Sequence, residues 1–320
     1  MEELMSKYIL ALRELQPEHQ KRVEEIAPDH KVIRSIEEAD AIEDIEILYS
    51  WKKDQGTELL NNDKNQLKWI QTASAGIDYL DLEELEKQEI ILTNSSGIHA
   101  KGIAESTMAM ILNYTRGIGH SLKAQLNAEW SELETLIELE EKTIMIVGTG
   151  EIGKQVGKLA KAFDMKTIGI NRSGDHADHM DEQHTQDDLS EVIGQADIVV
   201  NILPLTDETE DFFDKERFSN MKEQSIFINV GRGGSVVTDD LIDALENGNL
   251  AYAGLDVLHE EPLPEDHPLW KRDDVLITPH ISGHLENYDR HLFPIFEKNL
   301  KAFVENESLP VNVVDYSKGY

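Results

Sequence analysis

The chain has 320 residues, and 63 acidic side chains against 30 basic ones give it a formal net charge of −33. A chain of this length typically holds about two domains, and a hydrophobic content of 40 % is enough for packed cores. The strong negative charge disfavours nucleic acids and anionic membranes as partners. Because the sequence has no cysteine, disulfides, thiolate catalysis and cysteine metal sites are excluded.

The N-terminal segment 1–7 lacks the basic region and the apolar core of a signal peptide. No stretch of the chain approaches the roughly 18 uninterrupted apolar residues of a membrane span. We therefore expect a soluble cytoplasmic protein.

Short β-rich runs alternate with helical patterns, which is typical of βα units around parallel sheets. In the first 120 residues the pattern predicts helices over Gln20–Ile26 and over 103–117, where Gly117 is placed to end the helix. The strands expected in this part are Tyr8–Ala11, Ile45–Tyr49, Leu67–Thr72 and Ile90–Thr93.

From residue 143 onward the alternation becomes regular and indicates a doubly wound sheet. A helix is expected over Asp239–Glu246, ending at Gly248. No low-complexity linker is present, so we expect the chain to cross between domains in ordinary loops near 98–102 and 283–287. The strands expected in this part are Thr143–Val147, Thr167–Ile170, Ile198–Ile202, Ser225–Val230, Ala253–Val257 and Val275–Ile277.

A glycine-rich motif, G-x-G-x-x-G, directly follows the strand that ends at Val147 and opens the next helix. Gly148 permits the tight turn, Gly150 lets the backbone approach a pyrophosphate, and Gly153 lets helix and strand pack closely. The motif predicts a dinucleotide site, with a purely structural βα turn as the alternative. The intervening residues, which would share the phosphate contacts, are Thr149, Glu151 and Ile152.

The following strand ends at Asn171, 23 residues after Gly148. An NAD-selective site usually has an acidic residue here to bind the ribose 2′-hydroxyl, and that residue would repel the 2′-phosphate of NADP. Asn171 is neutral, and Arg172 beside Ser173 could bind a phosphate through a charged fork. The sequence therefore predicts NADP(H) in preference to NAD(H), unless Arg172 is only a solvated surface charge.

Three further segments lie at the carboxyl ends of expected strands, where function concentrates in this class of fold. Arg232 stands in a glycine-bracketed loop, Glu261 precedes a proline, and His280 follows one. Taken one by one, each could be a turn residue, a surface acid or a structural histidine.

These residues, in this order, resemble the D-isomer-specific 2-hydroxyacid dehydrogenase family, in particular its glyoxylate/hydroxypyruvate reductase-like and phosphoglycerate dehydrogenase-like members. The resemblance implies two Rossmann-like α/β domains with a cleft between them, and a homodimer formed through the cofactor domain. The substrate domain would be residues 1–100 and 285–320, and the dinucleotide domain residues 101–284. The other motifs that carry the resemblance are Thr72–Asp78, Asn94, Ala104-Glu105, Asn201–Thr206 and Pro268–Trp270.

The resemblance also implies roles for the three candidate catalytic residues. His280 would be the general acid that protonates the carbonyl oxygen as hydride arrives, and the base in the reverse direction. Glu261 would orient His280 and favour its charged form. Arg232 would fix the substrate carboxylate and polarise the keto oxygen.

The remaining roles implied by the resemblance concern binding. The backbone N–H groups of Ala75 and Gly76 would bind the substrate carboxylate, and His284 is the second candidate for substrate contact. Asp256 would accept a hydrogen bond from the nicotinamide carboxamide. His99, His259 and Lys101 are weaker candidates. Further cofactor contacts are expected from Leu203, Pro204, Thr209, Val230 and Gly231.

We therefore expect an enzyme that interconverts a small 2-oxo acid and its D-2-hydroxy acid, of the glyoxylate or hydroxypyruvate type. Formate dehydrogenase is disfavoured, because that enzyme has Gln where this chain has Glu261. A non-enzymatic, dinucleotide-dependent corepressor keeps the same three residues and stays open. No metal-site spacing is present, and His176, His179 and His184 are expected in a solvated loop.

Overall fold

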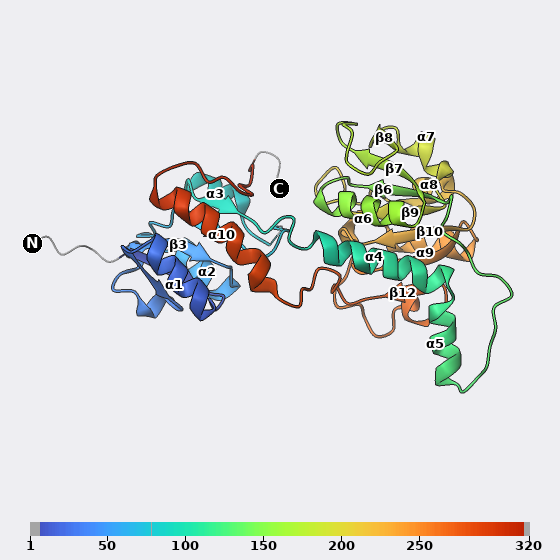
Figure 1. Cartoon of the computed structure of the whole chain (residues 1–320), viewed down its shortest axis with the longest axis horizontal. Coiled ribbons are helices and arrows are strands. Elements are labelled where there is room, and N and C mark those ends of the chain that lie inside the picture. Colours follow the sequence, from blue (N-terminus) through green and yellow to red (C-terminus); the bar gives the residue numbers. More distant parts are fainter. Residues whose placement is uncertain (1–6, 78, 317–320) are drawn as a thin grey trace, which may run out of the picture. The chain divides into compact units, whose positions relative to one another are not determined.

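The computed structural model describes residues 7–77 and 79–316, so Asp78 of the Thr72–Asp78 motif lies outside the described residues. The chain divides into two compact units (Figure 1). Unit 1 is Met1–Ile98 with Leu285–Tyr320, and unit 2 is His99–His284. No helix among the described residues is long and apolar enough to cross a membrane.

Unit 1 is built on a five-stranded, all-parallel sheet with the strand order β2-β1-β3-β4-β5. The last helix of the chain returns to this unit and packs beside the first one (Figure 1). Its elements are β1 (Lys7–Ala11), α1 (Pro17–Ile26), β2 (His30–Ile33), β3 (Ile45–Tyr49), α2 (Lys53–Leu60), β4 (Trp69–Gln71), α3 (Leu82–Lys87), β5 (Ile91–Thr93) and α10 (Tyr288–Val304).

Both faces of the unit 1 sheet are covered, as an all-parallel sheet requires. Alternate side chains of β1 point to opposite faces: Ile9 packs with α1 and α10, whereas Leu10 packs with α2 and α3. On the first face Trp69 stacks on Phe296 of α10, with ring centroids 5.1 Å apart. The strands are therefore apolar on both sides, which explains why they read as continuous hydrophobic runs.

Unit 2 contains a seven-stranded, all-parallel sheet with the order β12-β11-β10-β9-β6-β7-β8. The strand order reverses between β6 and β9, which is where doubly wound sheets bind ligands. Its elements are α4 (Ala100–Thr115), α5 (Ile118–Leu126), β6 (Thr143–Val147), α6 (Glu151–Ala162), β7 (Lys166–Asn171), β8 (Glu182–Thr185), α7 (Leu189–Val192), β9 (Ile198–Asn201), α8 (Lys215–Asn220), β10 (Ser225–Asn229), α9 (Thr238–Glu246), β11 (Leu250–Leu255) and β12 (Val275–Ile277).

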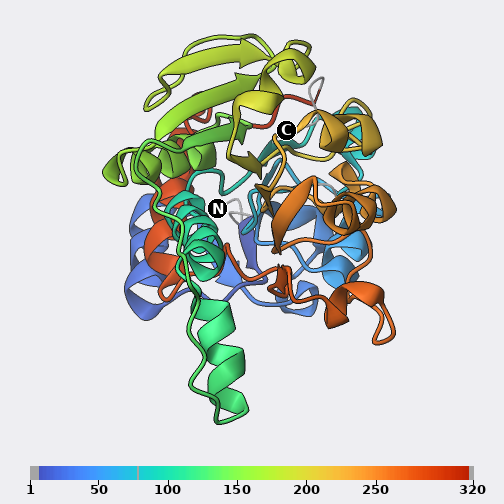
Figure 2. The same cartoon turned by 90° about the vertical axis from the view of Figure 1, so that its right-hand side faces the viewer.

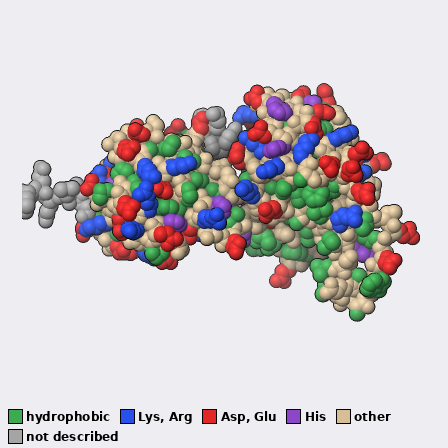
Figure 3. All heavy atoms as spheres, viewed as in Figure 1, with side chains coloured by type: hydrophobic (Ala, Val, Ile, Leu, Met, Phe, Trp, Pro, Cys, Tyr) green, Lys and Arg blue, Asp and Glu red, His purple; other side chains and the backbone are tan. Residues whose placement is uncertain are grey.

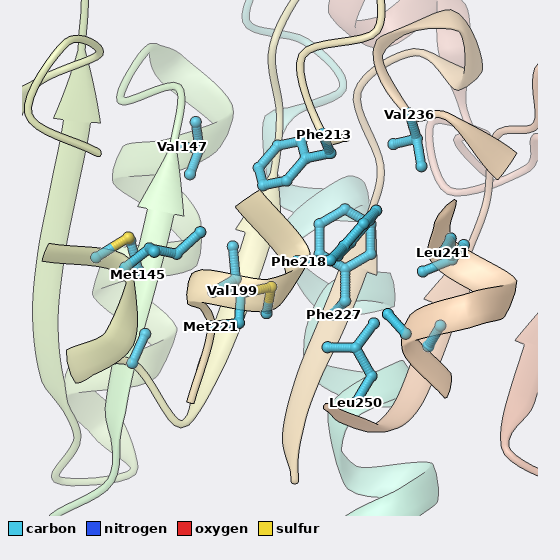
Figure 4. Packing of buried hydrophobic residues seen from close by; sticks show 14 of the residues in the cluster. Met145, Val147, Val199, Phe213, Phe218, Met221, Phe227, Val236, Leu241 and Leu250 are labelled. Carbon is cyan, nitrogen blue, oxygen red and sulfur yellow. The ribbon is translucent and has the colours of Figure 1, made fainter. Parts of the chain in front are cut away.

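Two hydrophobic layers sandwich the unit 2 sheet. Ile144 and Ile146 of β6 face α4 and α6, whereas Met145 and Val147 face α7, α8 and α9. Figure 4 shows the second layer, in which aromatic side chains from β10, α8 and the loop before it pack against one another. The expected doubly wound α/β architecture is thus confirmed in both units.

The helices and strands differ from the predicted ones at several places. The short strands β2 and β8 and the helices α5 and α10 were not predicted, and β8 runs through the segment expected to be a loop around His184. Helix α4 begins and ends earlier than predicted, and Gly117, with a φ of +67°, follows its C-terminus as expected. Figure 2 shows α5 and the chain after it projecting from the rest of unit 2.

Candidate active site

The candidate residues of unit 2 lie at one edge of its sheet. Because all seven strands are parallel, their carboxyl ends meet at this edge. Gly148 follows β6, Leu203 and Pro204 follow β9, and Arg232 follows β10. Asp256 and His280 come directly after β11 and shortly after β12.

The glycine-rich turn has the geometry of a phosphate cradle. Gly148 has a φ of +107°, a conformation that favours glycine. A Cβ added at Gly153 would lie 2.2 Å from the carbonyl oxygen of Gly148, so helix and turn are in close contact there. A Cβ at Gly150 would meet nothing within 4 Å, and this glycine, which directly precedes α6, puts no side chain over the N–H groups of the helix N-terminus. The cradle therefore fits the pyrophosphate of a dinucleotide.

The segment after β7 forms a closed turn around Asn171. Its amide nitrogen donates to Thr149 Oγ1 and to the Asp175 carbonyl, both at 2.8 Å, and its Oδ1 accepts from Gly174 N at 2.7 Å. Arg172 pairs with Glu208 Oε1 at 2.7 Å, and both side chains are more than 60 % exposed. So exposed an ion pair is weak, and the guanidinium can exchange this partner for another anion at little cost.

The loop after β9 is held by buried polar contacts. Leu203 is buried and its N–H donates to Asn201 Oδ1, and the buried Thr209 donates from its hydroxyl to the Pro204 carbonyl at 2.6 Å. A Cβ at Gly231 would lie 2.6 Å from the Leu203 carbonyl oxygen. The loops after β9 and β10 therefore touch, and the expected cofactor residues Leu203 and Gly231 lie together.

A hydrogen-bond network of three buried side chains supports the Arg232 loop. Asn201 donates to Asn229 Oδ1 at 3.0 Å and to Ser235 Oγ at 2.7 Å. Asn229 and Ser235 in turn donate to the Arg232 carbonyl at 3.2 and 2.7 Å. The network fixes the backbone from which the guanidinium projects. Asn229 and Ser235 were not predicted as site residues, although both stand within three residues of Arg232.

Gly233 connects the Arg232 loop to the Glu261 loop. A Cβ at Gly233 would come within 1.9 Å of the Leu258 carbonyl carbon, so the two backbones are in direct contact. Leu258 N donates to Glu261 Oε1 at 2.9 Å. The other carboxylate oxygen, Oε2, lies 2.8 Å from His280 Nδ1. Unit 2 therefore links the loops of all three candidate catalytic residues.

His280 is held in a conformation that is unusual for its residue type. Its φ is +53°, in the left-handed region, and its N–H contacts the carbonyls of Asp256 and Thr278, both at 2.9 Å. A carboxylate can only accept, so the contact with Glu261 assigns the proton on Nδ1 to the imidazole and leaves Nε2 for exchange with a ligand. The pair can orient and stabilise an imidazolium.

Asp256 is buried, and its carboxylate accepts hydrogen bonds from the segment after β12. Thr278 Oγ1 donates to Oδ1 at 2.6 Å, and Ile281 N donates to the same oxygen at 3.0 Å. Ser282 donates from its hydroxyl to Oδ2 and from its N–H to both oxygens. Sequence reasoning placed Asp256 in the site but missed Thr278 and Ser282, which flank His280.

Ala75 and Gly76 belong to unit 1, in the loop after β4. The Ala75 carbonyl accepts from Asn94 Nδ2 at 3.1 Å and the Gly76 carbonyl from Ser74 Oγ at 2.9 Å. The loop is also anchored by Tyr288, whose hydroxyl donates to the Ala73 carbonyl and whose pKa is raised by burial. These hydrogen bonds hold three backbone carbonyls of the loop in place.

The remaining histidine candidates and Lys101 differ in their contacts and exposure. His99 Nδ1 contacts the Gly283 carbonyl at 2.8 Å, and His284 N donates to Ile281 in the turn after His280. His259 and Lys101 are exposed, as are His176 and His179, whereas His184 lies on β8 near Glu182. Within residues 7–77 and 79–316, no group of three or more His, Asp or Glu side chains has the arrangement of a metal site.

Comparison with known proteins agrees with this geometry. A family model described as "D-isomer specific 2-hydroxyacid dehydrogenase, NAD binding domain" matches residues 108–282, more than half of the chain. The chain belongs to this family. It is therefore an NAD(P)-dependent oxidoreductase of 2-hydroxy and 2-oxo acids, and the resemblance seen in the motifs is confirmed.

Individual relatives span most of this dehydrogenase. A glyoxylate reductase from Thermofilum pendens is 35 % identical over 254 residues, which cover 77 % of this chain and 75 % of the relative. A family member of known structure from Aeromonas salmonicida is 30 % identical with a TM-score of 0.82, covering 97 % and 99 % of the two chains. An NADPH-dependent glyoxylate/hydroxypyruvate reductase from Sinorhizobium meliloti, solved with NADP and sulfate, is 26 % identical with a TM-score of 0.81 and covers 98 % and 100 %.

Proposed function

We propose that this dehydrogenase reduces a small 2-oxo acid, of the glyoxylate or hydroxypyruvate type, to the D-2-hydroxy acid, with His280 as the proton donor. The observation that carries the proposal is the 2.8 Å contact between His280 Nδ1 and Glu261 Oε2. The substrate class is supported by the names of the relatives from Thermofilum pendens and Sinorhizobium meliloti. Glu261 supports this proposal over the formate dehydrogenase alternative, because that enzyme has Gln at this position.

The mechanism follows from the protonation state of the imidazole. Glu261 accepts from Nδ1–H and stabilises the cationic ring, so Nε2 carries the proton that moves to the carbonyl oxygen of the substrate. The nicotinamide cofactor, when bound, supplies the hydride to the carbonyl carbon. In the oxidative direction neutral Nε2 removes the hydroxyl proton, and Glu261 again stabilises the imidazolium that forms.

Arg232 binds and polarises the substrate in this proposal. Its guanidinium can form two parallel hydrogen bonds to a carboxylate and can also reach the keto oxygen, where negative charge develops. The buried network of Asn201, Asn229 and Ser235 holds the Arg232 backbone and so limits the freedom that binding must remove. In unit 1, which the proposal takes as the substrate domain, the backbone N–H groups of Ala75 and Gly76 are the proposed carboxylate donors.

The cofactor is NADP(H) in preference to NAD(H). Asn171 presents no negative charge to a 2′-phosphate, and the exposed Arg172 can exchange Glu208 for it. The relative from Sinorhizobium meliloti binds NADP. Gly148–Gly153 would hold the phosphates of the cofactor, and Asp256, Val230 and the loop from Leu203 to Thr209 would hold the rest of it.

Steady-state kinetics test both parts of the proposal. NADPH and NADH are crossed with glyoxylate, hydroxypyruvate, pyruvate and bulkier 2-oxo acids, and we expect the highest kcat/KM for a small acid with NADPH. Arg172→Ala should lower kcat/KM for NADPH about 10- to 100-fold, the value of one or two charged hydrogen bonds, and leave NADH unaffected. A clear NADH preference contradicts the cofactor assignment. Absence of turnover with every acid favours the corepressor-like binding protein.

The projecting segment of unit 2 favours a second copy of this chain as the partner. Ile118, Leu122 and Leu126 recur every four residues on α5 and share one face, with Leu126 80 % exposed and Trp130 94 % exposed. A surface of this kind is rarely left in water, and a homodimer buries it without another protein. Figure 3 shows hydrophobic side chains on the surface of this segment. The apolar patch consists of Ile118, Leu122 and Leu126 on α5, and of Trp130, Leu133, Leu136 and Ile137 in the chain that follows it.

A further inference from the structure

The buried carboxylate of Asp256 binds the turn that carries His280 rather than a basic side chain. Thr278, Ile281 and Ser282 supply the donors, and together they surround His280 in the sequence. Asp256 is only 1 % exposed, so its side-chain oxygens depend on these contacts instead of water for hydrogen bonding. Hydrogen bonds to a buried carboxylate are stronger than those between neutral groups.

The turn needs such support because its backbone is strained. His280 has a φ of +53°, in the left-handed region that a non-glycine residue rarely adopts. The Asp256 backbone contributes as well, since its carbonyl accepts from His280 N at 2.9 Å. Asp256 therefore holds the turn in two ways. Its backbone carbonyl accepts from His280 N, and its carboxylate accepts from residues on both sides of His280.

The contacts of the carboxylate also limit what else it can bind. A carboxylate has roughly four lone-pair directions. Oδ1 accepts from Thr278 Oγ1 and Ile281 N, Oδ2 accepts from the Ser282 hydroxyl, and Ser282 N is shared between the two oxygens. At most one direction is left for a nicotinamide carboxamide, so most of the carboxylate's hydrogen bonding goes to the turn.

We propose that Asp256 is a positioning residue for proton transfer, which acts through Thr278 and Ser282 to set His280 against Glu261. The inference rests on the proposed function, in which His280 is the proton donor. This role differs from the cofactor contact that the family resemblance implies. It depends on the hydroxyl groups of Thr278 and Ser282, which donate to Asp256. Loss of either hydroxyl should loosen the imidazole and slow proton transfer while cofactor affinity is kept.

The test compares Thr278→Val and Ser282→Ala with the wild-type enzyme. The quantities measured are kcat, KM, the solvent isotope effect and the NADPH Kd. Each variant should lower kcat about tenfold and enlarge the solvent isotope effect, since a small misplacement of a catalytic group is costly. KM for the 2-oxo acid and the Kd for NADPH should change less than about twofold. Thr278→Ser, which keeps the hydroxyl, should restore kcat.

A matched control is Thr167→Val, which removes a buried hydroxyl at the amino end of β7 that donates to the His179 carbonyl at 2.8 Å. Its kcat should equal that of the wild type. If Thr278→Val and Ser282→Ala keep wild-type kcat, or if they raise the NADPH Kd instead, the positioning role is overturned. If the wild type itself turns over no 2-oxo acid, the proposed function fails and this role fails with it, which is a separate outcome.

Discussion

At the scale of single residues, the proposal assigns the chemistry to His280 and Glu261. The family resemblance implied that Glu261 orients His280, and the structure places the two side chains 2.8 Å apart. Nineteen positions separate them, and only the parallel sheet brings the two loops together. The motif around His280 also contained Thr278 and Ser282, but a hydroxyl in a loop has no pattern that reveals its partner. The contacts of Asp256 could be seen only in the folded chain.

Replacing Glu261 by Gln tests the orientation of the histidine. Gln can still accept from Nδ1–H, but it carries no charge to stabilise the imidazolium, so we expect kcat to fall on the order of 10- to 100-fold. The adjacent Glu260→Gln is the matched control, because it removes the same charge from an exposed neighbour. A kcat within twofold of wild type for Glu261→Gln, in steady-state assays, would contradict the role.

At the scale of elements, the regular part of the fold was predictable and the irregular part was not. The strands of unit 2 from β6 to β12 are long apolar runs after clear turn signals, so most were located correctly. By contrast β8 reads Glu-Gln-His-Thr and has no apolar residue to mark it, because it lies at the edge of the sheet. Helix α10 was missed because Pro294 lies inside it.

The glycine turn gives a prediction with its own control. Gly150→Ala places a Cβ in open space, with a φ of −70° that alanine accepts, so stability should be kept while the NADPH Kd rises about tenfold or more. Gly153→Ala places a Cβ 2.2 Å from the Gly148 carbonyl oxygen and should cost about 1–3 kcal/mol of stability. Fluorescence titration and urea denaturation measure the two effects. Equal Kd values for Gly150→Ala and wild type would argue against the cradle.

A buried cluster at the amino ends of the unit 1 strands predicts a pH dependence of stability. Burial lowers the pKa of His30, although Glu46 lies 3.2 Å from its Nε2, and its Nδ1 has no hydrogen-bond partner among the described residues. Burial alone would raise the pKa of Glu46, but ion pairs with Lys68 and Lys7 lower it instead, so this carboxylate stays charged.

The sign follows from these directions. Because the folded-state pKa of His30 lies below its unfolded value of about 6.5, the unfolded chain binds the proton first as the pH falls. The free energy of unfolding should therefore decrease from about pH 7 to 5.5, and His30→Gln should show a smaller decrease. Urea denaturation at the two pH values measures the difference. An identical decrease in both proteins would contradict the prediction.

At the scale of the whole molecule, composition described the surface but not the site. A net charge of −33 describes the chain as a whole, whereas the proposed function relies on the cradle at Gly150 and the guanidinium of Arg232 as local sites for anions. The apolar patch was equally hidden in the composition, because Ile118, Leu122 and Leu126 share one face only once α5 has formed. The family resemblance came from the order of the motifs along the chain and not from the net charge of the chain.

The patch predicts a homodimer of the full chain. Leu122→Asp with Leu126→Asp introduces two charges on the exposed face of α5 and should convert a species of twice the chain mass to the 36.3 kDa monomer. Phe163→Asp, at an apolar position 38 % exposed beyond the patch, should leave the assembly unchanged. Sedimentation velocity reports the mass. A monomeric wild type at micromolar concentration would contradict the proposal.

The central claim is that His280 moves the proton in a 2-oxo acid reduction, and single-turnover reduction of glyoxylate or hydroxypyruvate by His280→Ala tests it most directly. The rate should fall at least about 10²-fold, which is typical for loss of a general acid, while NADPH binds as in the wild type. A rate within a few-fold of wild type, with normal cofactor binding, would contradict the account.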